Sequence, residues 1–167
     1  CIVNEPSEFG TYSTDNGKIY SSNHDNTSGN YIITANYGII VPQTSVRNSN
    51  SGYAWALSPT SSVYRISSYP LDLKVATVAV SANAQVTIKA WMRRTSIALN
   101  FRLRVKGGQI AGVSNDITSS MTAAADAWEQ VSLTFTPTEA GVVEVFAECW
   151  GGSTYTGYVD DLTIIQA

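Results

Sequence analysis

The feature that most constrains this chain is the strict alternation of side-chain character along residues 84–94. Successive side chains of an extended strand point to opposite faces, so the alternation assigns every second residue to one side. The two sets are Val86, Ile88, Ala90 and Met92, and Thr87, Lys89, Trp91 and Arg93. The first set is aliphatic and predicts a buried face. The second mixes an aromatic ring with long hydrogen-bonding side chains, which is typical of an outer face that contacts a polar, ring-shaped ligand or a neighbouring protein.

Similar strand patterns recur along the rest of the chain. The predicted strands cover residues 18–21, 31–41, 53–57, 63–66, 71–80, 97–106, 109–113, 128–136, 142–150 and 157–165. In the 97–106 segment, Ile97 is expected to point inward with the other odd-numbered apolar residues. In the 71–80 segment, Leu71, Leu73 and Val75 are expected to share a face with Thr77.

Residues 118–127 form the only segment with helical character, and at about one to two turns it is too short to stand alone. We therefore expect a loop with a helical turn there. Short strands about 8–12 residues apart, with no helix for a crossover, predict an all-β fold, an antiparallel β-sandwich. One domain is predicted over residues 1–167. Residues 1–45 would be an irregular N-terminal arm or the first strands, and residues 46–167 the core sandwich.

Composition excludes two classes of partner. Charged residues make up 14% of the chain, the formal net charge is -3 and the pI is near 5.0, so no basic surface for nucleic acid is expected. No apolar run approaches the ~20 residues that a membrane-spanning helix needs. Abundant hydroxyl and amide side chains are typical of an extracellular protein or a virion surface protein.

The two cysteines, Cys1 and Cys149, are too few for a disulfide framework. The favoured interpretation is a buried free thiol at Cys149 and an incidental Cys1. A bridge between them would require the first and last strands to lie side by side. A lipid-modified Cys1 is a third interpretation, although Ile2 and Val3 stand where a polar tether is expected.

Four motifs occur in an order that is familiar: Ser51-Gly52, the strand over 86–94, Trp128 and Val131 followed by Phe135-Thr-Pro137, and Tyr158-Val-Asp-Asp-Leu162. Together they resemble the jelly-roll carbohydrate-binding modules and the wider galactose-binding-like domains, over roughly residues 45–165. The resemblance implies a jelly-roll β-sandwich that binds carbohydrate. Domains of this shape also occur as surface proteins of phages and viruses, and fold alone does not choose between these roles.

Catalysis has little support in the sequence, and we predict no catalytic residue and no enzyme. The single histidine, His24, lies in a polar turn, and neither a nucleophile elbow nor a zinc motif is present. Glu144 and Glu148 share a strand face, but four residues along a strand span ~13 Å, which is too far for paired glycosidase carboxylates. They are interpreted as partners of cross-strand cations. The candidate cations are Lys89, Arg93, Arg102 and Arg104.

The outward strand faces are the better candidates for a binding site. If their strands share a sheet, aromatic rings and hydrogen-bonding side chains would lie together. The predicted ligand-binding residues are Trp91, Arg93, Arg102, Arg104, Glu148 and Trp150. The tyrosine-rich segments 53–55 and 155–158 are second candidates, within which Trp55 is expected in the core.

The family resemblance also implies a structural calcium ion between the closing strand and the N-terminal segment. Asp160, Asp161 and Glu8 are the candidate ligands. Calcium needs six to eight oxygens, and neighbouring residues of a regular strand point to opposite faces, so one of the two aspartates at most would bind it. The alternative is a hydrogen-bonded aspartate at a strand edge. No other cofactor is expected.

Two functions therefore stand side by side. The first is a non-catalytic carbohydrate-binding module that mediates glycan or surface adhesion. The second is a structural surface, decoration or fibre protein of a virion or extracellular assembly, which uses the same face to contact another subunit, as a homo-oligomer or within a larger assembly.

Overall fold

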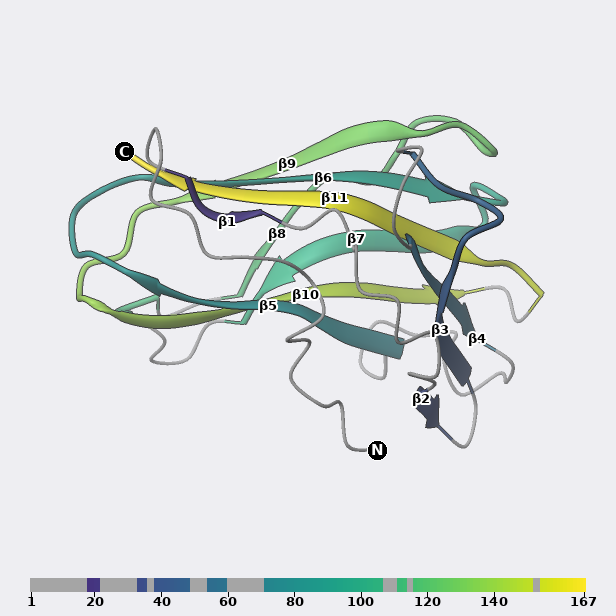
Figure 1. The fold of residues 1–167 in the computed structure, drawn as a ribbon, viewed down its shortest axis with the longest axis horizontal. Coiled ribbons are helices and arrows are strands. Elements are labelled where there is room, and N and C mark those ends of the chain that lie inside the picture. Colours follow the sequence, from purple (N-terminus) through teal and green to yellow (C-terminus); the bar gives the residue numbers. More distant parts are fainter. Residues whose placement is uncertain are drawn as a thin grey trace.

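The computed structural model of the chain is a sandwich of two antiparallel β-sheets, which form an upper layer with β9, β6 and β11 and a lower layer with β7, β10 and β5 (Figure 1). The residues it describes are 18–21, 33–35, 38–48, 54–59, 71–106, 111–113, 116–151 and 154–167. Within these ranges there is no helix, and hence none that is long and apolar enough to cross a membrane. The predicted all-β sandwich is confirmed.

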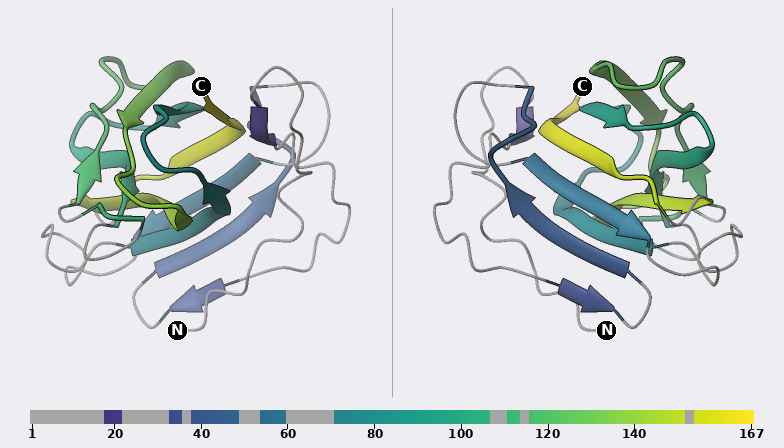
Figure 2. Two further views of the ribbon diagram at one scale, coloured as in Figure 1. Left: turned by 90° about the vertical axis from the view of Figure 1, so that its left-hand side faces the viewer. Right: turned by 90° about the vertical axis from the view of Figure 1, so that its right-hand side faces the viewer.

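The larger sheet has seven strands, in the order β2-β3-β4-β11-β6-β9, with β1 also paired to β11. Its strands are β1 (Lys18–Ser21), β2 (Ile33–Ala35), β3 (Gly38–Gln43), β4 (Ala54–Pro59), β6 (Val86–Arg94), β9 (Glu129–Phe135) and β11 (Gly157–Gln166). In Figure 2, the blue strands β2, β3 and β4 extend this sheet along one side of the sandwich.

The smaller sheet has four strands, in the order β5-β10-β7-β8. Its strands are β5 (Leu71–Val80), β7 (Leu99–Val105), β8 (Ile117–Thr118) and β10 (Gly141–Gly151). From β5 to β11 the chain therefore changes sheet at almost every connection. Strands that follow one another in the sequence mostly face each other across the core instead of pairing edge to edge.

The inward rows of side chains fill the space between the sheets. Val86, Ile88, Ala90 and Met92 of β6 are fully buried, which confirms the alternation in the sequence. The predicted inward row of β10, which ends at Cys149, is fully buried as well. Each large aliphatic side chain buried in this way contributes roughly 1.5–3 kcal/mol to the stability of the sandwich.

Three local predictions were wrong. Ile97 is 64% exposed because β7 begins only at Leu99. The pairing of β5 with β10 shifts register beside Val75, so Val78 turns inward and Thr77 does not share the face of Leu71. Residues 119–128 form a loop without a helical turn.

Several sequence predictions fall outside the described residues. These are the strand over 63–66, the turn at Gly107-Gly108, the Ser51-Gly52 motif, Tyr53, His24, Cys1 and Glu8.

Candidate functional site

The structure places the six predicted ligand-binding residues on two different sheets. The two groups are Trp91 and Arg93 on β6 of the larger sheet, and Arg102, Arg104, Glu148 and Trp150 on β7 and β10 of the smaller sheet. The condition under which all six would share one face, that their strands lie in one sheet, is therefore not met. Alternation shows which residues point outward, but it does not show which of the two sheets a strand joins. Ligand binding by either group stays a prediction.

The first candidate surface is the outer face of the smaller sheet, which we call the Trp150 face. It consists of Asp72, Lys74, Asn100, Arg102, Arg104, Lys106, Phe146, Glu148 and Trp150. In the pairing of β10 with β7, Glu148 lies opposite Arg102 and Trp150 lies opposite Asn100. Facing residues of an antiparallel pair point to the same side of the sheet, so these side chains meet on one surface.

Glu148 lies at the centre of the Trp150 face. Its side chain is buried although its position on β10 belongs to the outward row. Arg102 donates from Nε to Oε1 at 2.7 Å, and Arg104 donates from Nη1 to Oε2 at 3.0 Å. Arg104 also donates to Asp116. Because both carboxylate oxygens accept from guanidinium groups, the buried charge is compensated, and the two arginines are held in fixed positions.

The environment of Arg104 keeps it protonated. Burial lowers its pKa, but the hydrogen bonds and negative charges of Glu148 and Asp116 outweigh that effect, so the pKa is raised above its ordinary value. Glu144, the other candidate carboxylate, pairs with Lys74 at 3.2 Å. The interpretation of these glutamates as partners of cross-strand cations is confirmed for Glu148; Glu144 takes a lysine that was not among the expected cations.

The aromatic rings of the Trp150 face lie against cations. The guanidinium carbon of Arg102 is 4.6 Å from the ring centroid of Trp150. Lys106 Nζ is 4.2 Å from the ring of Phe146 and 3.3 Å from Asp72. Cation–π contacts of this kind fix the plane of a ring. The face therefore presents a half-buried indole plane beside guanidinium donors in a fixed arrangement.

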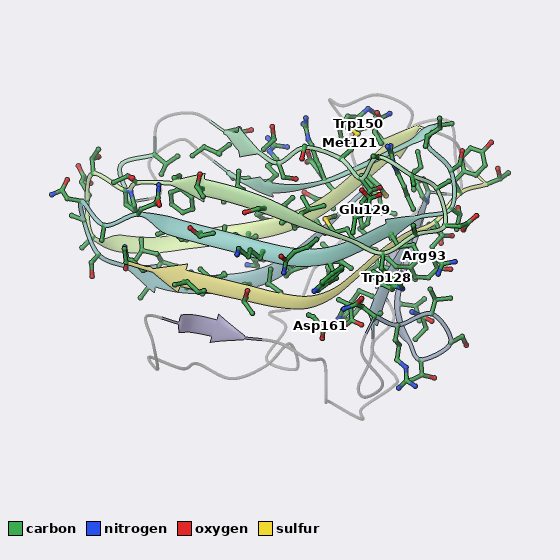
Figure 3. All side chains as sticks on the ribbon, turned by 90° about the horizontal axis from the view of Figure 1, so that it is seen from above. Arg93, Met121, Trp128, Glu129, Trp150 and Asp161 are labelled. Carbon is green, nitrogen blue, oxygen red and sulfur yellow. The ribbon has the colours of Figure 1, made fainter. Side chains whose placement is uncertain are left out.

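The second candidate surface, which we call the Trp128 corner, consists of Arg93, Asp126, Trp128 and Tyr158. Figure 3 shows Arg93 and Trp128 at one end of the larger sheet. The ring centroids of Trp128 and Tyr158 are 6.4 Å apart, with planes tilted by 54°. Tyr158 lies opposite Arg93 in the pairing of β11 with β6, so both point outward, as Trp91 does. Tyr158 was a second candidate in the sequence. Trp128 was missed as a candidate. It precedes the inward Val131 by three residues, and an odd number of residues along a strand places a side chain on the opposite, outward face.

The loop beside this corner, residues 119–128, is fastened to β6 by Arg94. Arg94 ends the inward row of β6 and is only 7% exposed. It donates to the carbonyl oxygen of Leu99 at 2.8 Å, and to the hydroxyl (at 3.1 Å) and carbonyl oxygens of Thr122. Its own carbonyl accepts from the backbone N–H of Asp126 at 2.8 Å. The backbone of Asp126 is therefore fixed against the end of β6.

Glu129 fastens the same loop from its other end. Its carboxylate accepts hydrogen bonds from the backbone N–H groups of Ala124 at 3.0 Å and Ala123 at 3.1 Å. These bonds, that of Ala124 first, favour the charged form and lower the pKa of Glu129 below its ordinary value of 4.5.

Asp160 and Asp161 lie at a β-bulge rather than in a regular strand. The pairing of β11 with β6 shifts register between Asp160 and Thr163, and Asp161 has a left-handed φ of 49°. Asn48 donates from its backbone N–H to Asp160 at 2.9 Å and from its side chain to Asp161 at 2.8 Å. The expectation that the two aspartates point to opposite faces was wrong, because the bulge brings both carboxylates to the same asparagine.

The described residues do not by themselves fit a calcium ion here. Calcium needs six to eight oxygen ligands, whereas within the described ranges no three acidic, histidine or cysteine side chains gather. Donors of Asn48 point at oxygens of both Asp160 and Asp161. This arrangement stabilises the carboxylates without a metal. Glu8, the third candidate ligand, lies outside the described residues, and calcium stays a prediction.

Cys149 is a free thiol in the core, which confirms the favoured interpretation of this residue, while Cys1 lies outside the described residues. Burial, followed by the charges of Glu148 and Asp72, raises its pKa well above the ordinary value, so the thiol stays neutral and unreactive. Trp55 is buried too, as expected.

Comparisons with known proteins place this fold. No protein-family model and no curated protein matches the sequence. A CBM22-1 and GH10 two-module fragment of Clostridium thermocellum xylanase 10B, complexed with xylohexaose, is similar over 90% of this chain, with a TM-score of 0.59 and 14% identity. This chain covers 29% of that longer chain.

Two further solved structures are single modules. The CBM22-1 xylan-binding domain of Paenibacillus barcinonensis Xyn10C covers 89% of this chain and is itself covered to 94%, with a TM-score of 0.56 and 10% identity. A family 16 carbohydrate-binding module covers 80% of this chain and is covered to 89%, with a TM-score of 0.52 and 14% identity. At these identities the likeness concerns the fold. The chain is a jelly-roll β-sandwich of the kind found in carbohydrate-binding modules.

Proposed function

We propose that this chain is a non-catalytic glycan-binding module and that the Trp150 face is its binding surface. The observation that carries the proposal is the buried Glu148, which fixes Arg102 and Arg104 beside the indole of Trp150. A side chain that makes no contact with solvent itself thus orients two that do. Binding sites are built in this way because fixed groups lose little entropy when a ligand arrives.

The chemistry of this surface suits a neutral sugar chain. A pyranose ring presents an apolar C–H face and an edge of hydroxyl groups. The part of the Trp150 ring that Arg102 does not cover supplies an apolar plane, while Arg102 and Arg104 supply several N–H donors in fixed directions. Ligand sites typically combine an apolar lining with a few fixed polar groups of this kind.

The similar folds support a polysaccharide as the ligand. Two of them are xylanase modules, one described as xylan-binding and one complexed with xylohexaose. Xylo-oligosaccharides are therefore the first probes. Affinity per site is expected to be low, with avidity from several sites acting together.

The two glutamates of β10 that were considered as paired carboxylates support a role without catalysis. Both oxygens of Glu148 accept from arginines, and Glu144 is paired with Lys74. A general acid must reach the substrate to exchange a proton with it, and a carboxylate buried between two guanidinium groups does not reach a ligand on this surface. In this proposal the module acts outside the cell or on a particle surface, where glycans are displayed.

Substitution of Trp150 tests the proposal directly. We expect Trp150→Ala to weaken binding of a neutral oligosaccharide about 30-fold, the size of a ~2 kcal/mol hot-spot loss, in isothermal titration calorimetry. Arg102→Lys should also weaken binding, while it leaves a cation next to Glu148. Trp91→Ala on the other sheet is the matched control and should stay within about twofold. An oligosaccharide affinity that is unchanged in both Trp150→Ala and Arg102→Lys would contradict the proposal.

The structural-protein hypothesis uses the same outer face as a subunit contact, and it is tested separately. If it holds, the chain forms a defined oligomer in light-scattering measurements, and Trp150→Ala dissociates that oligomer. A monomer at high concentration that binds sugar through Trp150 would exclude this hypothesis.

A further inference from the structure

The Trp128 corner contains the same classes of side chain as the Trp150 face, at a separate place. It belongs to the outer face of the larger sheet, and Figure 3 shows Arg93 and Trp128 close together at one end of that sheet. Outer faces of the two sheets in a sandwich point away from each other. A ligand at one surface therefore leaves the other accessible.

Two half-buried rings give this corner its apolar part. Trp128 is the residue before β9 and Tyr158 lies on β11, and their ring centroids lie 6.4 Å apart at a tilt of 54°. Because the planes are tilted rather than parallel, the two rings form an angled apolar surface instead of one covering the other. Both residues carry a polar group, an indole N–H and a phenol, at the edge of that surface.

A loosely joined ion pair gives the corner its polar part. Arg93 Nη2 is 3.5 Å from Asp126 Oδ1, and the Asp126 side chain is 62% exposed. An exposed pair at this distance is weak, and it leaves most of the five guanidinium N–H donors and the carboxylate lone pairs available. Within the described residues, Nε of Arg93 is buried and has no hydrogen-bond partner. The described neighbours thus leave the guanidinium incompletely satisfied.

The corner is held in place before any ligand arrives. Asp126 has a left-handed φ of 56°, and its N–H donates to the carbonyl of Arg94. The Arg94 side chain holds Thr122, and Glu129 holds the N–H groups of Ala123 and Ala124. The backbone that carries Asp126 is thereby fixed beside β6, which distinguishes this corner from a chance group of surface aromatics.

We infer that the Trp128 corner is a second glycan-binding site, which takes one neutral pyranose unit with vicinal hydroxyl groups. The rings contact the C–H face of the sugar. One hydroxyl group donates to Asp126, and the neighbouring hydroxyl accepts from Arg93. A carboxylate and a guanidinium side by side match this pair of hydroxyl groups. The exposed charge of Asp126 disfavours an anionic sugar or a phosphate.

This inference extends the proposed function, because a module with two such sites links two sugar chains or two parts of one chain. Two weak sites joined in one rigid body give avidity where the ligand presents both units within reach. The two sites stand or fall independently, since no described residue belongs to both.

The experiment follows the indole N–H signals of Trp128 and Trp150 by NMR, in the full chain and in Trp150→Ala. The probes are xylohexaose, cellohexaose, mannohexaose and β-1,4-galactohexaose. Each is titrated to about 10 mM, where a site with a Kd of about 1 mM is nearly saturated. We expect at least one probe to shift the Trp128 signal in both proteins. In Asp126→Asn, the affinity obtained from the titration of the Trp128 signal should fall about tenfold or more, because a hydrogen bond to a charged group is lost.

Glu139→Gln, which removes an exposed carboxylate from another turn, is the matched control and should leave the Trp128 titration unchanged. A Trp128 signal that moves with none of the probes overturns the second site. A shift that disappears in Trp150→Ala, or that persists unchanged in Asp126→Asn, overturns it as well. If no probe shifts the Trp150 signal of the full chain while the Trp128 signal does shift, the proposed function is contradicted and the second site still holds.

Discussion

The two outer faces of the sandwich carry the same kinds of side chain in two different states. On the Trp150 face the central acid, Glu148, has no exposed surface and lies 2.7 and 3.0 Å from two arginines. At the Trp128 corner the acid, Asp126, is 62% exposed and lies 3.5 Å from one arginine.

The difference shows how burial decides what a charged group does. A buried carboxylate must be fully paired, so Glu148 has no capacity left for a ligand and instead positions the arginines. An exposed carboxylate keeps its capacity, so Asp126 contacts the ligand directly in our proposal. Substitution of the two acids should therefore have different main effects, that of Glu148 on stability and that of Asp126 on binding.

The largest effect is expected from Glu148→Ala. It leaves Arg102 and Arg104 without their common partner, and we expect the free energy of unfolding to fall by about 3 kcal/mol, at the low end for a broken buried pair because both arginines reach solvent. Urea denaturation measures this change. Glu144→Ala on the same strand, whose pair with Lys74 is more exposed, should cost about 0–1 kcal/mol. An equal loss of unfolding free energy in Glu148→Ala and Glu144→Ala would contradict the conclusion that burial distinguishes Glu148.

A smaller effect is expected from Arg94→Lys. Lysine keeps the charge but cannot reach Leu99 and both oxygens of Thr122 with one planar group, so the free energy of unfolding should fall by about 2 kcal/mol. The neighbouring Arg93→Lys, on the outer side of the same strand, should change it by about 0.5 kcal/mol or less. Thermal unfolding of both variants distinguishes the inward arginine from the outward one, and a larger loss for Arg93→Lys would contradict their assignment.

The smallest effect concerns pH. The pKa of Glu129 is lower in the folded chain than its ordinary value of 4.5, so its stabilising contribution is complete above pH 4.5 and is lost as the pH falls through the folded pKa. Glu129→Gln should therefore lower Tm slightly at pH 7, and the difference from the parent chain should shrink as the pH falls below 4.5 and through the folded pKa. A difference that stays constant over this range would show that the carboxylate is not responsible.

Alternation in the sequence predicted the fold and the direction of most side chains. The inward row of β6 and the outward row of β10 both follow from a period of two residues, and Glu148 was correctly expected to pair with arginines across the strands. This success has a local cause, because the side of a strand that a residue occupies depends only on its immediate neighbours.

The assembly of the candidate site was less predictable. Trp91 and Trp150 would have shared a face if their strands had shared a sheet. Their strands lie in different sheets, because pairing between strands depends on contacts far apart in the sequence. The bulge at Asp160 and Asp161 was missed for a related reason. One extra residue on β11 changes which side chains point the same way. The left-handed residue is an aspartate, which tolerates this backbone conformation, so no glycine in the sequence signals the bulge.

The most direct test of the account is the position of a bound oligosaccharide in a crystal structure of the complex. We predict a sugar ring against the indole of Trp150, with hydroxyl groups bonded to Arg102 and Arg104. A sugar that occupies a strand edge or a loop away from both outer faces, with no contact to Trp150, would contradict the account.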